Sequence, residues 1–219
     1  MKVLLKQAHI ISPSSAYHRH VKDILIIDGF IREIADQVNS ETDQVIVQDN
    51  LHVSIGWMDL FAHFNDPGHE QKETLQSGAA AAAAGGFTDV MIIPNTNPAI
   101  SAKGQVEYIL QKASTLPVNI HPIGSITKNA EGKELAEMYD MYNSGARAFS
   151  DGTLPVQSPG ILTKALQYVL AIDAPIFQLP DDKSLSVHGL MHEGVMSTRL
   201  GLPGKPAIAE ELMIARDIE

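Results

Sequence analysis

Side chains that can bind metal ions, transfer protons or hold polar substrates follow several apolar runs of this sequence. They occur in five short segments, at residues 59–68, 94–98, 120–122, 149–152 and 177–182. The most prominent members are His63, Asn95 and Asp151. One such segment alone means little, because polar residues are common in loops. Five segments in the same relation to apolar runs indicate a site that several loops assemble.

The apolar runs alternate with helix-forming segments at a regular interval of about 30 residues. Runs typical of strands begin near Val53, Phe87, Val118, Ala146 and Pro175. Helices are expected at 70–84 before Gly85-Gly86, at 131–143, and at 160–172 after Ser158-Pro159. Repeated strand–helix units predict parallel strands, whose carboxyl ends carry the active site in such folds.

The number of these units limits the possible architectures. Residues 52–219 hold five to six units, whereas a complete (β/α)8 barrel needs about 250 residues. The sequence therefore predicts an α/β fold, either an open doubly wound sheet or the N-terminal part of a TIM-type (β/α)8 barrel. In the second case the other strands lie in a longer polypeptide or in another chain, because an incomplete barrel leaves strand edges unpaired.

A small β module is expected before the repeated units, over residues 1–51. Its short apolar runs include Ile24–Ile27 and Phe30–Ile34, which Asp28-Gly29 separates. Asp-Gly between two such runs is a strong hairpin signal, because both turn positions favour positive φ. We expect residues 1–51 to form a small β-sandwich module and residues 52–219 to form the barrel domain.

The composition indicates which binding partners and which cellular compartment to expect. The 219 residues contain 16 basic and 26 acidic side chains, which gives a formal net charge of −10, and no cysteine. The sequence has no cluster of basic residues, so nucleic acid is not an expected partner. The longest uncharged run, residues 74–88, is too short to span a bilayer. The absence of cysteine and of a signal-peptide pattern favours a cytoplasmic protein.

Several collinear motifs resemble those of the dihydroorotases of the amidohydrolase superfamily. Residues 56–68 read GWMDLFAHFNDPG and are similar to the family's first-strand signature, Gly-x-x-Asp-x-His-x-His-x-Arg-x-Pro-Gly. Residues 86–98 resemble the second-strand segment and residues 149–151 the fourth-strand aspartate segment. Residues 181–217 resemble the stretch after the fifth strand. The resemblance covers the chain from about residue 52 to its end.

The resemblance implies a (β/α)8 metallohydrolase of pyrimidine synthesis. Dihydroorotases use zinc to interconvert dihydroorotate and N-carbamoyl-L-aspartate. Zinc lowers the pKa of its bound water to about 7 and polarises the amide carbonyl. The resemblance also implies a homo-oligomer, and aspartate transcarbamoylase or another enzyme of the pathway as a possible partner.

This sequence departs from the family pattern at the positions that matter most for metal binding. The resemblance places metal ligands at His63 and Asp151, but Phe61 and Leu179 stand where two further histidines are expected. Asn65 replaces the arginine that holds the substrate carboxylate, and an amide lacks the charge and the bidentate geometry of a guanidinium. A catalytic zinc usually takes three protein ligands. We therefore expect zinc to be absent or weakly bound, and the apolar replacements to fill the former metal cavity.

Other interpretations of these residues stay open. His121 is a further candidate ligand, which would allow an active zinc-dependent dihydroorotase with an altered ligand set. The resemblance gives Asn95, like Asn65, a substrate-binding role, yet Asn95 could instead hold its loop. His63 and Asp151 could equally be an ordinary hydrogen-bonded histidine and a turn aspartate. A doubly wound nucleotide-binding protein is the weakest alternative, because no Gly-rich fingerprint follows the first strand.

Overall fold

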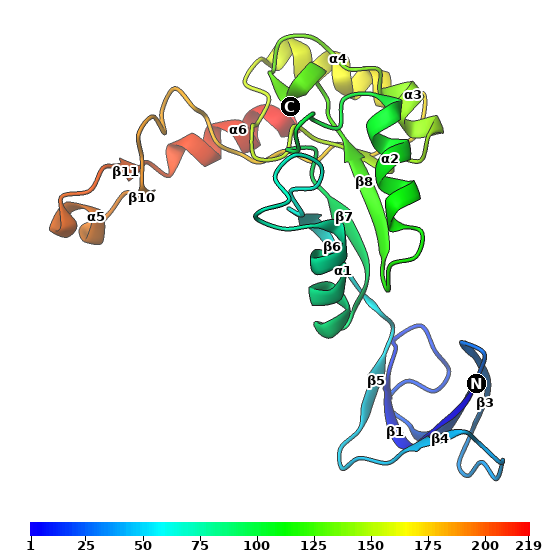
Figure 1. Cartoon of the computed structure of the whole chain (residues 1–219). Coiled ribbons are helices and arrows are strands. Elements are labelled where there is room, and N and C mark those ends of the chain that lie inside the picture. The colour runs from blue at the N-terminus through cyan, green and yellow to red at the C-terminus, as the bar shows by residue number, and fades with distance from the viewer. The chain divides into compact units, whose positions relative to one another are not determined.

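The computed structural model describes residues 1–219, and they divide into two compact units (Figure 1). The first unit comprises Met1–Gly56 and the second Trp57–Glu219. The division therefore falls five residues later than the boundary expected after residue 51. The reason is that His52–Ser54 pairs with the first strand of the N-terminal sheet.

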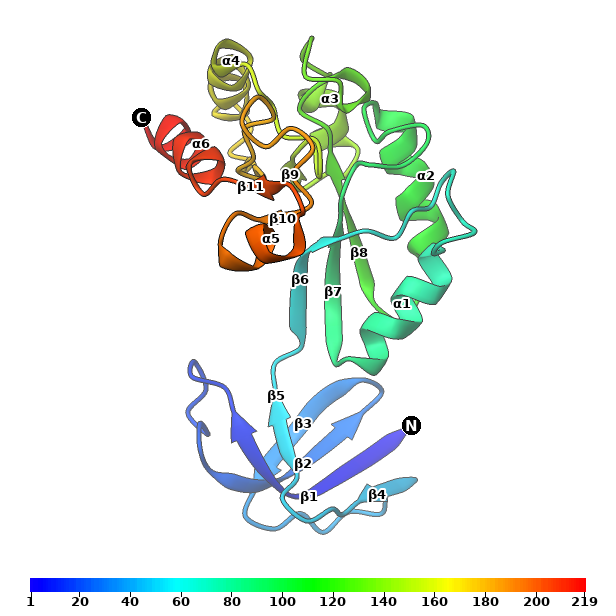
Figure 2. The same ribbon diagram turned by 90° about the vertical axis from the view of Figure 1, so that its left-hand side faces the viewer.

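The first unit is one mixed five-stranded sheet. Its strands are β1 (Lys2–Ile11), β2 (Val21–Ile27), β3 (Phe30–Ala35), β4 (Gln44–Ile46) and β5 (His52–Ser54). Strand β1 is antiparallel to β2 on one side and parallel to β4 and β5 on the other (Figure 2). All five strands belong to one hydrogen-bonded sheet, so a sandwich of two sheets stays a prediction.

The hairpin expected at Asp28-Gly29 is confirmed. Ile27 pairs with Phe30 across the turn, and β2 and β3 run antiparallel. Asp28 and Gly29 have φ values of 50° and 82°, as a two-residue turn with two left-handed positions requires.

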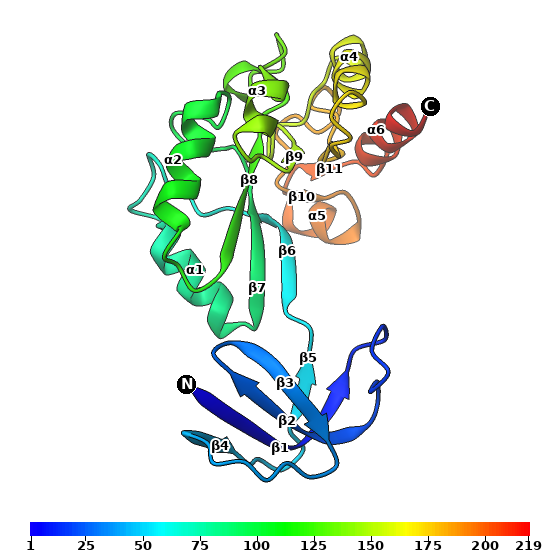
Figure 3. The same cartoon turned by 90° about the vertical axis from the view of Figure 1, so that its right-hand side faces the viewer.

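The second unit contains a parallel sheet whose strands follow one another in chain order (Figure 3). The strands are β6 (Trp57–Ala62), β7 (Phe87–Ile92), β8 (Asn119–Gly124) and β9 (Ala148–Phe149). A single parallel bridge from Phe149 to Ile176 continues the series at the fifth expected position. A doubly wound sheet reverses its strand order, and this one does not. The order matches consecutive strands of a curled barrel sheet.

Helices join these strands and cover one face of the sheet. They are α1 (Leu75–Ala84), α2 (Lys103–Ala113), the short 3₁₀ helix η1 (Lys128–Ala130), α3 (Met138–Asn143) and α4 (Pro159–Val169). Alternate residues of β7 point to opposite faces. Val90 and Ile92 join the large core under the helices, whereas Met91 and Ile93 pack with Ile123 on the other face.

The remaining elements follow the fifth strand position. They are β10 (Met191–His192), α5 (Val195–Leu200), β11 (Gly204–Lys205) and α6 (Ile208–Ile218). Strands β10 and β11 form a short parallel pair. Helix α6 is joined to the preceding segment by the Asp182 amide, which donates to the Ala209 carbonyl. No helix has the length and apolar character that crossing a bilayer would require.

Two of the expected helices begin later than the sequence suggests. Helix α1 begins at Leu75 and not near residue 70, because Thr74 and Ser77 form a capping box there. Residues 131–137 are not helical, and α3 begins at Met138. In this segment Gly132 takes a φ of 71° and donates its amide to Thr127 Oγ1. That backbone conformation is left-handed, so it is incompatible with a continuing right-handed helix.

The helix start expected at Ser158-Pro159 is confirmed. Ser158 Oγ accepts a hydrogen bond from the Ile161 amide, and Pro159 occupies the first helical position. The helix ends at Val169, three residues before the expected end.

Candidate functional site

The polar segments meet at the carboxyl ends of the parallel strands, except that the third strand ends later than expected. His63 follows β6, Asn95 follows β7 and Asp151 follows β9. Strand β8 continues past the expected end at 120–122 and reaches Gly124. Thr127, which no sequence pattern singled out, is therefore the polar residue that the third strand brings to this edge.

A chain of hydrogen bonds links His63, Asn95 and the loop after β9. His63 Nε2 lies 3.1 Å from the Asn95 carbonyl oxygen. The side-chain amide of Asn95 donates to the Asp151 carbonyl at 3.1 Å, and its oxygen accepts the Thr153 amide at 2.9 Å. Asn95 thus holds the strand-end loops together, and both ends of its amide are occupied by backbone.

Asp151 is completely buried, and its carboxylate is bound to Thr127. The Thr127 amide donates to one carboxylate oxygen at 2.9 Å, and the Thr127 hydroxyl donates to the other. The same hydroxyl accepts the Gly132 amide at 2.8 Å. Burial raises the pKa of Asp151, although the hydrogen bonds from Thr127 oppose this effect. Asp151 therefore fixes the loop that carries Thr127 and Gly132.

Asn65 turns its side chain back onto its own loop. Its amide nitrogen donates to the His63 carbonyl at 3.1 Å, and its backbone has a φ of 60°. Asparagine tolerates this left-handed conformation better than most residues do. The side chain is half-buried and carries no charge toward the strand ends.

The two apolar replacements are partly exposed in residues 1–219, and their packing in a former metal cavity stays a prediction. Phe61 is 39% exposed and Leu179 is 38% exposed. Phe61 lies on β6, which pairs only with β7 and is an edge strand. In residues 1–219 no strand pairs with its other side, and the apolar side chains of this edge are exposed.

His121 lies apart from the strand-end network. It sits within β8 opposite Met91 and bonds Asp89 of β7 at 2.8 Å through Nε2. The hydrogen bond from His121 is the largest of the effects that lower the pKa of Asp89. The structure therefore does not bring His121 to His63 and Asp151.

The candidate zinc ligands that residues 1–219 supply at the strand ends, His63 and Asp151, are fewer than the three that a catalytic zinc usually takes. His63 bonds a carbonyl oxygen, and both oxygens of Asp151 bond Thr127. His, Cys, Asp and Glu side chains form no group of three or more that could hold a metal anywhere in residues 1–219. A catalytic zinc needs about three such ligands.

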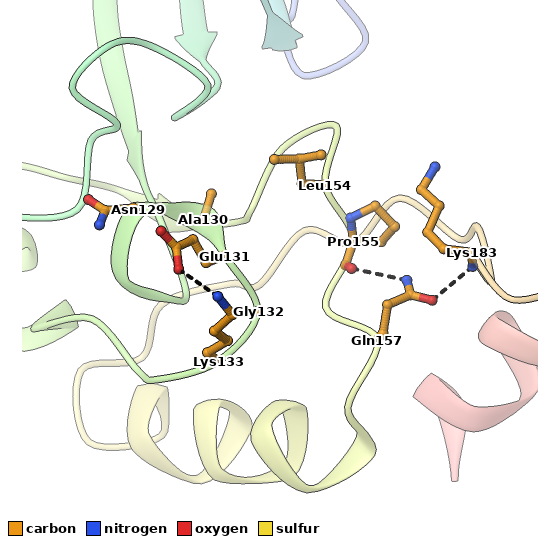
Figure 4. A pocket seen from close by; sticks show the side chains of 9 residues that line it. All are labelled: Asn129, Ala130, Glu131, Gly132, Lys133, Leu154, Pro155, Gln157 and Lys183. Atoms are coloured by element: carbon orange, nitrogen blue, oxygen red, sulfur yellow. Dashed lines mark hydrogen bonds and ion pairs between the residues drawn. The ribbon is translucent and has the colours of Figure 1, made fainter. Parts of the chain in front are cut away.

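A cavity of about 380 Å³ lies beside this network, between the loops after β8 and β9 and Lys183 (Figure 4). Its wall includes Glu131 and Lys133, which form an exposed ion pair at 3.1 Å. Gln157 also lines the cavity, and its side-chain amide donates to the Pro155 carbonyl at 3.0 Å and accepts the Lys183 amide at 2.8 Å. None of His63, Asn95 and Asp151 lines this cavity. Polar side chains that already have partners thus form much of its wall.

Asp181 anchors the segment after the fifth strand position. It should make the free energy of unfolding depend on pH in the acidic range. It is 6% exposed and binds Lys183, and Lys205 of β11 at 3.0 Å. Burial alone raises its pKa, but the hydrogen bonds from Lys183 and Lys205 hold the pKa well below the ordinary range. An aspartate of this kind stabilises the fold above its ordinary pKa of about 3.9, and this stability is lost as the pH falls below that value.

We therefore expect the free energy of unfolding of Asp181→Asn to fall less than that of the wild type as the pH drops below about 4. Urea denaturation midpoints at stepped pH values measure this. Asp140→Asn, which changes an exposed carboxylate on α3, should keep the wild-type pH dependence. Parallel curves for Asp181→Asn and the wild type would contradict the assigned role.

Comparison with known proteins places these features in a family. Residues 52–219 match the family model described as dihydro-orotase-like. The chain is 41% identical over 219 residues to the dihydroorotase of Ruminiclostridium cellulolyticum, and 41% identical over 218 residues to that of Pelotomaculum thermopropionicum. Each alignment covers 100% of this chain and 51% of the relative. The chain thus spans about half the length of these curated relatives.

Solved structures show the same fold at low sequence identity. The L-hydantoinase (dihydropyrimidinase) of Arthrobacter aurescens superposes with a TM-score of 0.68 at 20% identity, over 84% of this chain and 41% of that one. A dihydroorotase superposes with a TM-score of 0.58 at 13% identity, over 98% of this chain and 62% of that one. The match to the family model over most of the chain shows that this protein belongs to the dihydro-orotase-like family.

Proposed function

We propose that this chain belongs to a cyclic amidohydrolase homologue whose own metal site is degenerate and inactive. Membership of the dihydro-orotase-like family supports a role in pyrimidine biosynthesis. The observation that carries the proposal is the bonding of Asp151, whose two carboxylate oxygens are both bound to Thr127. A buried carboxylate whose two oxygens both accept hydrogen bonds from one residue supports the loop that carries this residue.

Substrate recognition is also weakened at Asn65. The related dihydroorotases act on an anionic substrate, and the resemblance assigns the binding of its carboxylate to an arginine at this position. Asn65 instead bonds the His63 carbonyl. A neutral amide provides neither the charge nor the paired donors of a guanidinium. The loss of metal ligands and the loss of the anion-binding group therefore point in the same direction.

Metal content and turnover test this proposal. We expect the purified protein, in the longest natural polypeptide that carries this sequence, to contain no zinc bound through His63 and to leave dihydroorotate unchanged. His63→Ala should alter neither zinc content nor activity. The dihydroorotase of R. cellulolyticum, assayed in parallel, is the positive control. Turnover of dihydroorotate that His63→Ala abolishes would instead establish an active enzyme with an altered ligand set.

The open edge of β6 supports a second part of the proposal, that the sheet is half of an eight-stranded barrel. Strand β6 pairs only with β7, and Met58 and Leu60 are 47% and 52% exposed. The chain also covers about half of its relatives. A segment equivalent to the other half of the relatives would pair with this edge and cover its apolar side chains.

An inactive barrel of this kind would act through contacts with other proteins. We propose a cytoplasmic scaffold that forms a homo-oligomer or binds another enzyme of the pathway, such as aspartate transcarbamoylase. The exposed apolar residues of α5 and α6 offer contact surface, with Val195 84% and Ile218 78% exposed. Analytical ultracentrifugation with and without aspartate transcarbamoylase tests both associations.

A further inference from the structure

Two histidines of the N-terminal sheet face each other across neighbouring strands. His9 of β1 and His52 of β5 are direct partners in the parallel register, so their side chains point to the same face. Their ring centroids are 4.8 Å apart, and His9 Nδ1 lies 3.1 Å from His52 Nε2. These side chains belong to the unit formed by Met1–Gly56, and nothing described above uses them.

The tautomer of His52 follows from its third neighbour. Its Nδ1 lies 2.8 Å from the Asn50 carbonyl oxygen. A carbonyl oxygen can only accept, so His52 Nδ1 carries the proton and Nε2 presents its lone pair toward His9. In the absence of a cation, His9 Nδ1 donates to this lone pair.

We propose that His9 and His52 form a binding site for a late first-row divalent metal ion such as Zn²⁺. Two imidazole nitrogens at the usual Zn–N distance on one tetrahedral ion are about 3.3 Å apart. The observed separation of 3.1 Å is close to this value, so small rotations of the two rings would bring both lone pairs onto one ion. Imidazole is a preferred ligand for zinc, copper and nickel.

The surroundings of the pair suit such an ion. Ligating histidines usually donate their second ring nitrogen to a carboxylate or a backbone carbonyl, as His52 does toward Asn50. His52 is exposed and His9 is half-buried, so water can reach the ion and complete its coordination. With two protein ligands, this site binds more weakly than a structural site with four.

The ion would join the two strands that the site spans. Strand β5 contributes only three residues to the sheet. An ion shared by His9 and His52 would therefore hold the last strand of the N-terminal unit to β1, and the free energy of unfolding of that unit would rise with the logarithm of ion concentration above the dissociation constant. Zinc found in this protein would then come from the N-terminal sheet and not from the barrel residues His63 and Asp151.

Calorimetric titration of the full chain with Zn²⁺ tests the site. We expect His52→Gln and His9→Gln each to weaken zinc binding at least tenfold. His9→Gln is the informative variant, because its amide can still donate to His52 Nε2 while the imidazole ligand is gone. His20→Gln changes an exposed histidine of the same unit and is the matched control. His63→Ala should leave this affinity unchanged.

The outcomes separate this proposal from the proposed function. Zinc affinity that is equal in the wild type, His9→Gln and His52→Gln overturns the metal site and leaves the degenerate barrel untouched. Zinc affinity lost only in His63→Ala overturns both proposals. Loss in His9→Gln and His52→Gln, with circular dichroism spectra like those of the wild type, supports the N-terminal site.

Discussion

Replacing Asp66 by alanine is expected to lower the free energy of unfolding of the barrel unit by about 3 kcal/mol. Asp66 is completely buried after β6, and both of its oxygens lie 2.9 Å from Lys112 Nζ of α2. It also accepts the Leu75 amide at the start of α1 at 3.0 Å. The change removes the link between these three segments. The estimate lies at the low end for buried pairs because Lys112 is 30% exposed and can turn toward water.

Chemical denaturation followed by circular dichroism measures this effect. Glu134→Ala is the matched control, since it breaks the exposed ion pair with Lys128 in the same unit. Such surface pairs contribute little, so we expect its denaturation midpoint to equal that of the wild type. If both variants had the same midpoint, the assigned role of Asp66 would be wrong.

Gly152→Ala is expected to lower the free energy of unfolding by about 3 kcal/mol, because the alanine has both a backbone and a steric penalty. Gly152 has a φ of 63°, which costs an alanine about 1 kcal/mol. The added Cβ would also overlap Asn95 Oδ1. Asn95 would have to move, and its hydrogen bonds to the Asp151 carbonyl and the Thr153 amide would break, at about 1 kcal/mol each.

Gly132→Ala separates the backbone cost of a positive φ from the cost of displacing Asn95. Gly132 has a φ of 71°, but no atom lies within 4 Å of the position that its Cβ would take. It should therefore show the backbone cost alone. In a background with Asn95→Ala, we expect the cost of Gly152→Ala to fall to that of Gly132→Ala. Equal costs for the two glycine variants in the natural background would show that Asn95 does not hold this loop.

Features that depend on neighbouring residues could be predicted from the sequence. The hairpin at Asp28-Gly29 and the helix start at Ser158-Pro159 each rest on contacts within a few residues. The composition of residues 131–143 predicts a helix over the whole segment, but it gives no sign that Thr127 binds the Gly132 amide and keeps residues 131–137 out of the helix. That bond depends on Asp151, which holds the Thr127 hydroxyl from 24 positions away.

The sequence also located most of the strand-end residues but not their partners. Asn95 and Asp151 lie 56 positions apart, and only the pairing of neighbouring strands brings their loops into contact. Lys112 is 46 positions from Asp66, and nothing in its local pattern distinguishes it from a solvated lysine. Thr127 carries no pattern of its own. Its importance comes from the extension of β8 to Gly124.

The sequence by itself determined which chemical groups stand at the positions where the family resemblance expects ligands. Phe61 and Leu179 cannot bind a metal, and Asn65 cannot supply a charge, whatever the fold. Only the tertiary structure decided how the surviving residues are used, with Asp151 bonded to Thr127 and Asn95 to backbone. The physical reason is that residue type fixes what a side chain can bind, whereas strand order and register fix which partners come within bonding distance.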